Sequence, residues 1–255
     1  MTRAEARSRF LPAALGLGTL AAFLIAAEAA IRFGLVNRFI VPMPTQVGAA
    51  VWRVITEEDL PGRFLFTMGE GLVAGAMLTV FGIALGALMY RVRLLRAACE
   101  TWVAALASAP VVLMYPLFLV IFGRSAWTII MIGFVAGLPA VILKTIEGFS
   151  ATRQVLLNVG RSFNLTPRQQ FFKILVPSAL PTIFTGLRLG LIFALINIVG
   201  VEFLINFGGL GQIINDLSER YDMPATYVAI AAVILVSVVF FDATGRVEKW
   251  LTRAR

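Results

Sequence analysis

The residue types that carry most enzyme chemistry are scarce in this sequence. Its 255 residues include one cysteine, Cys99, and no histidine. A Ser–His or Cys–His nucleophilic pair is therefore excluded, and so is a zinc site of the usual Cys/His type. The glycine cluster Gly208–Gly211 lacks the lysine of a Gly-x-x-x-x-Gly-Lys-Ser/Thr phosphate loop. We therefore expect no catalytic residue, no metal site and no bound cofactor.

Three polar residues within one long apolar stretch are the remaining candidates for a functional site. Arg188, Asn197 and Glu202 occupy this stretch, and an ionisable group inside a membrane span by default indicates a pathway or binding site. Arg188 is about two turns from the nearer end, so its side chain could instead extend to the membrane surface. Glu202 is expected either to line the outer mouth of a pathway or to meet solvent. Asn197, about one to two turns deeper, is a further pathway candidate.

The composition indicates that these residues belong to a membrane protein. Hydrophobic residues make up 59% of the chain and charged residues 14%, whereas soluble domains have about 45–50% and about 25%. The mean hydropathy is +0.89. Six stretches approach the roughly 20 apolar residues that a membrane helix needs. They are Phe10–Ala27, Gly71–Tyr90, Thr101–Gly123, Ser125–Leu143, Ile174–Val201 (interrupted by Arg188) and Met223–Phe241.

Lysine and arginine residues predict the orientation of the six spans. Such residues are enriched in cytoplasmic segments, and here they cluster before the first span, after the second, after the fourth and after the sixth. The pattern predicts both termini in the cytoplasm of a multi-pass protein of the inner (plasma) membrane, and it argues that the net charge of +8 does not mark a nucleic-acid binder. The clustered residues are Arg3, Arg7 and Arg9; Arg91, Arg93 and Arg96; Lys144, Arg153, Arg161, Arg168 and Lys173; and Arg246, Lys249, Arg253 and Arg255.

Two spans allow alternative interpretations. The first could be a signal peptide, but its apolar region exceeds the 7–15 residues of a signal core, and Glu28 lies where cleavage would occur. We therefore expect a retained helix. In the third span, Pro110 and Pro116 predict either a simple kink or a broken helix that lines a cavity. Arg124 alone separates the third span from the fourth, which predicts a hairpin.

The segments expected outside the cell contain a short helix and an acidic loop. Thr45 is expected to cap a helix over Gln46–Ile55, because threonine is a good N-cap residue. The loop before the last span carries Asp216, Glu219 and Asp222 against Arg220, so it is net acidic.

The cytoplasmic segment between the fourth and fifth spans, residues 152–177, is too long for a simple connector. A first helix is expected over Thr152–Phe163, with an apolar stripe of Val155, Leu156, Val159 and Phe163, and with Gly160 placed for close packing. Asn164 suits the left-handed position after a helix, Thr166 and Gln169 can form a capping box, and Pro167 suits the first helical position. This second helix should end near Val176, where Pro177 interferes. The pair of helices is either a structural loop packed under the bundle or an element that docks into a soluble partner.

The segment resembles the "EAA" loop of ABC importer permeases. That motif runs Glu-Ala-Ala, three residues, Gly, about nine residues and Ile-x-Leu-Pro. Here Asn158-Val159-Gly160 stand at the first positions, Asn164 at the glycine, and Ile174-Leu175-Val176-Pro177 at the end. Asn158 removes the usual acidic residue and with it any ion pair typical of the family, while Asn164 can keep the turn. Weaker matches, in the same order as in the family, are Val41–Thr45, Phe122-Gly123, Pro181, Thr185–Gly190, Glu202 and Gly208–Gly211.

The resemblance covers nearly the whole chain and is greatest to the sulfonate, taurine and nitrate branch. It implies an all-α integral membrane protein of the type I ABC importer permease fold: one domain over residues 1–255, six transmembrane helices, and cytoplasmic coupling helices within residues 152–177. It implies a separate ATPase dimer that binds ATP, a solute-binding protein outside, and a second permease copy. The substrate would be a small solute such as an organic anion. An ion-gradient-driven transporter or channel and a membrane-embedded enzyme are the rival interpretations. The implied ATPase-coupling residues are Asn158, Val159, Gly160, Arg161, Phe163, Asn164, Thr166, Pro167 and Pro177.

Overall fold

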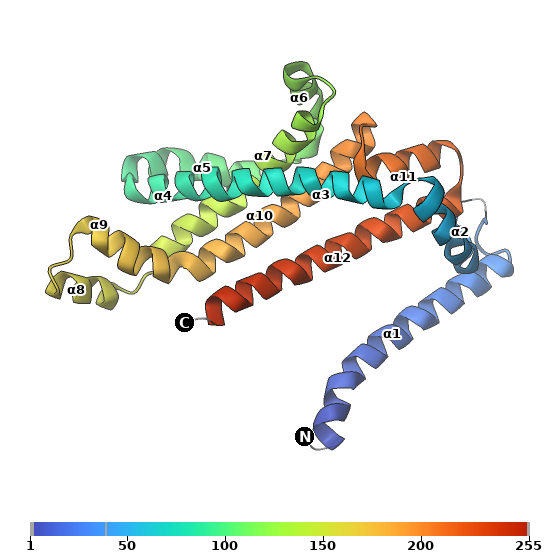
Figure 1. Ribbon diagram of the computed structural model, residues 1–255, viewed down its shortest axis with the longest axis horizontal. Coiled ribbons are helices and arrows are strands. Elements are labelled where there is room, and N and C mark those ends of the chain that lie inside the picture. The colour runs from blue at the N-terminus through green and yellow to red at the C-terminus, as the bar shows by residue number, and fades with distance from the viewer. Residues whose placement is uncertain (1–2, 39, 254–255) are drawn as a thin grey trace.

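The computed structural model describes the backbone of residues 3–38 and 40–253 and the side chains of residues 14–38 and 40–246. All regular structure in this part is helical (Figure 1). The helices are α1 (Arg3–Arg32), α2 (Pro44–Glu57), α3 (Leu60–Met77), α4 (Ile83–Arg91), α5 (Arg93–Ser108), α6 (Tyr115–Phe122), α7 (Ala126–Ser150), α8 (Gln154–Ser162), α9 (Pro167–Gln170), α10 (Val176–Ile205), α11 (Gly209–Glu219) and α12 (Met223–Arg253). Two π turns, η1 (Leu78–Gly82) and η3 (Phe171–Leu175), and a 3-10 turn, η2 (Val111–Met114), join some of them. The side chains of the orientation residues Arg3, Arg7, Arg9, Lys249, Arg253 and Arg255 lie outside the described part.

Five helical segments are long and apolar enough to cross a membrane unaided. They are Ala14–Arg32, Leu60–Arg91, Ala126–Ser150, Pro167–Ile205 and Met223–Arg246. Each overlaps one of the predicted stretches, so these five spans are confirmed. The segment Leu60–Arg91 is 32 residues long and begins eleven residues before the expected start at Gly71, because the helix continues through Glu70.

The third predicted stretch is not one straight helix. The axes of α5 and η2–α6 differ by 95°, with the break between Ser108 and Val111. Ala109 is extended (φ −77°, ψ 136°) because it precedes Pro110, which disfavours the helical region for that residue. The stretch is therefore broken and not simply kinked, and α6 projects from the bundle in Figure 1. That the broken helix lines a cavity stays a prediction. The expected hairpin at Arg124 is present as the short turn between α6 and α7.

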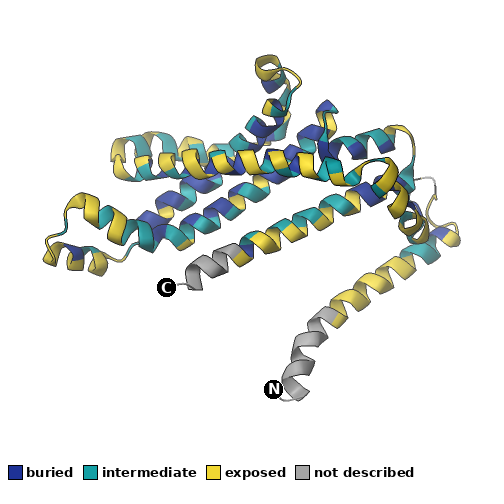
Figure 2. Cartoon of the chain, viewed as in Figure 1, coloured by how far each residue is buried: buried dark blue, intermediate teal, exposed yellow. Residues whose placement is uncertain are grey.

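Helices α7 and α10 form the centre of the bundle. They make the most extensive helix pair, and their backbones meet at Gly137 and Gly190: a Cβ on Gly137 would lie 2.4 Å from the carbonyl oxygen of Gly190. Small residues permit this approach in lipid, where helix association depends on close packing. Ile132 and Ile198 beside the crossing are completely buried. Figure 2 accordingly shows buried residues concentrated along these two helices.

The helices place two functional regions at opposite ends of the long axis (Figure 1). The α4–α5 turn, α8, α9 and the end of α12 lie toward one end, and α2 and α11 lie toward the other. The basic segments after the second, fourth and sixth predicted spans therefore lie at the same end, whereas α1, which follows the first basic segment, begins nearer the middle of this axis.

Helix α1 stands apart from the bundle in Figure 1 and is joined to it through α2. The prediction that Thr45 caps α2 is wrong. The helix begins at Pro44, two residues before the expected start at Gln46, because proline suits the first helical position. The backbone N–H and hydroxyl of Thr45 instead donate to the Glu28 carboxylate, at 3.1 and 2.9 Å, and Glu28 also pairs with Arg32 at 2.8 Å.

Two of the three acidic residues of the loop are paired with arginines from other elements, and Glu219 is exposed and accepts a hydrogen bond from Asn215 at 3.1 Å. Asp222 pairs with Arg53 of α2 at 2.6 Å, and Asp216 pairs with Arg63 of α3 at 3.3 Å. The hydrogen bond that Arg53 donates to Asp222 raises the pKa of the Arg53 guanidinium above its ordinary value. These pairs hold α2, α3, α11 and the start of α12 together at this end, so Asp216 and Asp222 are not a free negative surface.

Candidate functional site

The predicted joint in the loop between α7 and α10 is present. Helix α8 ends at Ser162, and Asn164 adopts the left-handed conformation with φ 52°. The Asn164 N–H donates to the Arg161 carbonyl at 2.9 Å, and the Leu165 N–H donates to the Gly160 carbonyl at 3.0 Å. These two bonds form a Schellman motif, which satisfies the last carbonyls of a helix. Asn164 therefore sets the direction in which the chain leaves α8.

The capping box at the start of α9 is also confirmed. The Thr166 hydroxyl accepts from the Gln169 N–H at 3.3 Å, and the Gln169 side chain accepts from the Thr166 N–H at 2.9 Å. The predicted end of this helix at Pro177 is wrong. The π turn η3 joins α9 to α10, and the helix continues past Pro177 and Pro181. A π turn moves the hydrogen-bond pairing by one residue, which lets the helix pass a residue that has no N–H.

The loop is attached to the bundle by packing on both of its halves. A Cβ on Gly160 would lie 2.5 Å from Cδ1 of Ile174, so the glycine lets α8 fold closely onto η3. The Phe171 ring stacks against Phe149 of α7 (centroids 5.6 Å apart), and Phe149 contacts Tyr90 of α4 (5.2 Å). A displacement of the loop would therefore be transmitted to α4, α7 and α10.

The apolar stripe of α8 faces away from this packing. The exposed fractions are 62% for Val155, 42% for Leu156, 48% for Val159 and 76% for Phe163. Asn158, at the position where the motif has an acid, is exposed and accepts a hydrogen bond from Gln154 at 3.3 Å. The predicted coupling residues on α8 and in the turn are therefore brought together at one end of the molecule. Pro177 lies apart from them, half-buried in the first turn of α10.

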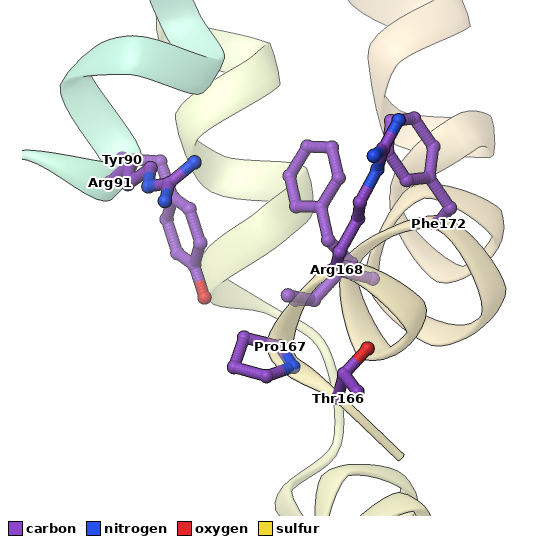
Figure 3. A pocket seen from close by; sticks show the side chains of 8 residues that line it. Tyr90, Arg91, Thr166, Pro167, Arg168 and Phe172 are labelled. Atoms are coloured by element: carbon purple, nitrogen blue, oxygen red, sulfur yellow. The ribbon is translucent and has the colours of Figure 1, made fainter.

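A hollow of about 700 Å³ lies between this loop and the end of α4 (Figure 3). Phe171, Phe172 and Leu175 contribute apolar walls, and the guanidinium groups of Arg91 and Arg168 are at its rim. Such a site suits an apolar side chain with an acidic neighbour. Its full lining is Tyr90, Arg91, Thr166, Pro167, Arg168, Phe171, Phe172 and Leu175.

Glu202 was expected to face the outer mouth or solvent, and this expectation is wrong. The residue is completely buried. Its carboxylate accepts hydrogen bonds from the Thr67 hydroxyl of α3 at 2.7 Å and from the Gly211 N–H of α11 at 2.8 Å. The Leu210 N–H in turn donates to the Thr67 hydroxyl at 2.9 Å. Glu202 therefore fixes the first turn of α11 to α10 and α3.

The glycine cluster after α10 is required by this arrangement. Gly209 has φ 72°, and a Cβ there would lie 2.0 Å from Oε1 of Glu202. A Cβ on Gly211 would lie 2.2 Å from the backbone carbonyl of Val199. The two glycines therefore let backbone N–H groups approach a buried carboxylate, which the positive end of a helix favours. We call the group of Thr67, Glu202, Gly209, Leu210 and Gly211 the outer junction.

Two residues of this region were not predicted. Glu70, one turn after Thr67, is only 4% exposed, and both of its carboxyl oxygens are buried without a hydrogen-bond donor. Arg124 donates to the carbonyls of Ile205 and Asn206 and so caps the end of α10. The helix-start signal Asp59-Leu60-Pro61 could have revealed Glu70, because it places the start of α3 well before the charge-free stretch.

The other two pathway candidates do not join Glu202 in one site. Arg188 is half-buried, with its guanidinium 3.8 Å from the centre of the Phe241 ring of α12, and it donates to the Phe241 carbonyl at 3.3 Å. Asn197 is half-buried, and its amide donates to the Phe193 carbonyl of its own helix at 2.9 Å. Arg188 and Glu202 are separated by about 21 Å along α10, at 1.5 Å per residue.

Comparisons with known proteins agree with this architecture. The family described as "Binding-protein-dependent transport system inner membrane component" matches residues 78–253. The formylaminopyrimidine transport permease protein ThiX of Halalkalibacterium halodurans is 27% identical over 218 residues, which are 84% of this chain and 85% of that protein. The nitrate import permease protein NrtB of Synechocystis is 28% identical over 207 residues, covering 78% and 74% of the two chains.

The fold is also found in solved structures. The inward-facing MetNI methionine ABC transporter has a chain that superposes with a TM-score of 0.64 at 21% identity, covering 82% of this chain and 98% of that chain. At this sequence identity the similarity shows a shared fold only. A chain of an amino acid ABC transporter crystallised with histidines gives the same TM-score at 17% identity.

Proposed function

Because the chain belongs to the family of binding-protein-dependent transport inner membrane components, we propose that it is the permease subunit of an ATP-driven ABC importer. In this role residues 1–255 form one transmembrane domain and line the pathway of a small solute. The chain itself performs no catalysis, and ATP is bound and hydrolysed by a separate subunit.

The observation that carries the proposal is the exposed apolar stripe on α8. An exposed apolar patch beside polar residues is typical of a protein–protein contact. Arg153, Arg161, Arg168 and Lys173 surround it and are exposed. Residues 152–177 thus form a coupling loop whose α8 would insert into a groove of a cytoplasmic ATPase dimer. The hollow beside Thr166 and Pro167 would take a second, acidic segment of that partner.

The remaining partners follow from the same assignment. The cytoplasmic location of the coupling loop places both termini in the cytoplasm of the inner (plasma) membrane and places α2 and α11 outside. A solute-binding protein would deliver substrate at that outer end. A second permease copy would complete the pathway, with membrane lipid around the pair and no role for nucleic acid.

For the substrate we propose a small organic anion such as a sulfonate or taurine, or a nitrate-like anion. The basis is the sequence resemblance to that branch together with the match to a nitrate import permease. Because the chain also matches a formylaminopyrimidine permease, a small heterocycle is the alternative substrate, and the same uptake assay tests it. ATP-dependent uptake of labelled taurine, nitrate and a pyrimidine by proteoliposomes of the complete transporter would decide between them.

The docking role is tested with two matched valine substitutions. Val159 lies on the stripe and is 48% exposed, whereas Val51 lies on α2 at the other end and is 40% exposed. Val159→Asp should abolish co-purification with the ATPase subunit and uptake, because it places a charge in the apolar contact. Val51→Asp should leave ATPase co-purification unchanged.

Undiminished ATPase binding by Val159→Asp would refute the docking role. Transport driven by an ion gradient, with the permease reconstituted alone and without nucleotide, would refute the importer assignment and favour a secondary transporter or channel.

A further inference from the structure

Glu70 is a buried acid that the proposed function does not use. It lies on α3 one turn after Thr67, so both residues are on the face that meets α10 and α11. Its side chain is 4% exposed, and neither carboxyl oxygen has a donor among the described residues. Thr67, on the same face of α3, donates to Oε1 of Glu202 at 2.7 Å, so the carboxyl groups of Glu70 and Glu202 share this buried region.

The hydrogen bonds of Glu202 indicate which of the two glutamates carries the negative charge and which carries the proton. Oε1 accepts from the Thr67 hydroxyl and Oε2 accepts from the Gly211 N–H. The Thr67 hydroxyl accepts from the Leu210 N–H, and of the two acceptors for its proton, Oε1 of Glu202 at 2.7 Å is closer than the Arg63 carbonyl at 3.3 Å. Both oxygens of Glu202 therefore act as acceptors, as those of a carboxylate do.

The positive side chains on the neighbouring elements are committed elsewhere. Arg63, two turns before Glu70 on α3, pairs with Asp216 of α11 at 3.3 Å, and Arg124 caps α10. Arg53 of α2 pairs with Asp222. Arg188 lies about 21 Å away along α10. The remaining charged groups on the elements that pack against α3 are Glu57 of α2, Lys144 and Glu147 near the far end of α7, and Glu219 of α11.

An ionised Glu70 would therefore be a buried charge without a cation, next to a second carboxylate. Burial of an isolated carboxylate is so costly that such a group takes up a proton instead, and two carboxyl groups that share one site do not both ionise. A proton on Glu70 removes the unpaired buried charge and the repulsion between the two carboxylates, because the protonated acid then donates a hydrogen bond to Glu202.

We propose that Glu70 and Glu202 form a proton-binding site in the outer half of the bundle, in which Glu70 holds the proton and Glu202 carries the single negative charge. The outer junction stabilises one negative charge, because its hydrogen-bond donors, the first turn of α11 and the Thr67 hydroxyl, both point at Glu202. The bound proton thereby becomes part of the structure that fixes α11 to α3 and α10.

The test is infrared spectroscopy of the full-length permease in lipid nanodiscs at neutral pH. A protonated carboxylic acid gives a carbonyl band that is separate from carboxylate bands and shifts in D2O. We expect this band in the wild-type protein, and we expect Glu70→Gln to remove it. Glu28→Gln is the matched control and should retain it, because Glu28 is paired with Arg32 and Thr45.

Glutamine has nearly the same shape as the protonated acid and can donate to Glu202, so Glu70→Gln should insert and fold. If it does not, Glu70→Asp keeps an acid at this position and should shift the band. The absence of the band from the wild-type protein would overturn the proposal, and so would a band of equal intensity in Glu70→Gln. Neither outcome depends on the ATPase or on transport.

Discussion

The outer junction predicts that a single added methyl group at Gly211 will separate α11 from α10. The Cβ of Gly211→Ala would lie 2.2 Å from the Val199 carbonyl oxygen and 2.6 Å from the Phe203 backbone nitrogen. Both are backbone atoms of the central helix α10, so neither can move aside as the end of a side chain could. The first turn of α11 must move, and the 2.8 Å bond from the Gly211 N–H to Glu202 is then lost.

The magnitude follows from three contributions. Alanine is favoured over glycine within a helix by about 1 kcal/mol. Overpacking costs about 1–3 kcal/mol, and leaving a buried charged group without its donor costs about 1.5–3 kcal/mol. The variant should therefore lose about 1.5–5 kcal/mol of unfolding free energy.

Reversible unfolding of the purified permease in mixed micelles, followed by far-UV circular dichroism, measures this loss. Gly71→Ala in α3 is the matched control, because a Cβ there meets nothing within 4 Å. The control should be unchanged or up to about 1 kcal/mol more stable. Equal stability of the two variants would refute the close approach of α11 to α10.

Substitutions at three further contacts should change ATPase co-purification or the free energy of unfolding by different amounts. Asn164→Val forces a β-branched residue to φ 52° at a cost of about 1–2 kcal/mol, so ATPase co-purification should fall, whereas Asn164→Gly should retain it. Arg188→Leu removes the contact with Phe241 and should cost about 1–2 kcal/mol in the same unfolding assay; no change would show that the contact is absent in lipid. Arg53→Gln breaks a partly exposed pair with Asp222 and should cost less than about 1 kcal/mol, a difference that should shrink in high salt.

Features that depend on neighbouring residues could be predicted from the sequence. Asn164, Thr166 and Pro167 each have a conformational or capping preference that acts within a few residues, and the joint forms as these preferences indicate. Five of the six apolar stretches are likewise confirmed as spanning helices, because the thickness of the bilayer sets their length. The end of a helix at Pro177 was predicted on the same local basis and is wrong, because the π turn at Phe171–Leu175 supplies a second way to pass a proline.

Features that depend on distant partners could not be predicted. Glu202 looked like a residue of the outer mouth because nothing near it in the sequence reveals that Thr67, 135 positions away, donates to it. Glu70 was overlooked because a search for charge-free stretches ends at an acid, although the helix continues through it. The choice between a kink and a break at Pro110 also depends on neighbouring helices, which the sequence does not place.

The uninterrupted helical run from Pro167 to Ile205 has a mechanical consequence. Its 39 residues follow about 58 Å of helix at 1.5 Å per residue, with the capping box of the coupling loop at one end and Glu202 three residues from the other. Helix α10 alone has 30 residues, about 45 Å at 1.5 Å per residue, and acts as a lever: a tilt of about 5° displaces its far end by about 4 Å. In the proposed orientation, a movement of the coupling loop would thus reach the end that meets the solute-binding protein through a single helix. A substitution that weakens the π turn would reduce the coupling between the two ends without altering the structure of either end.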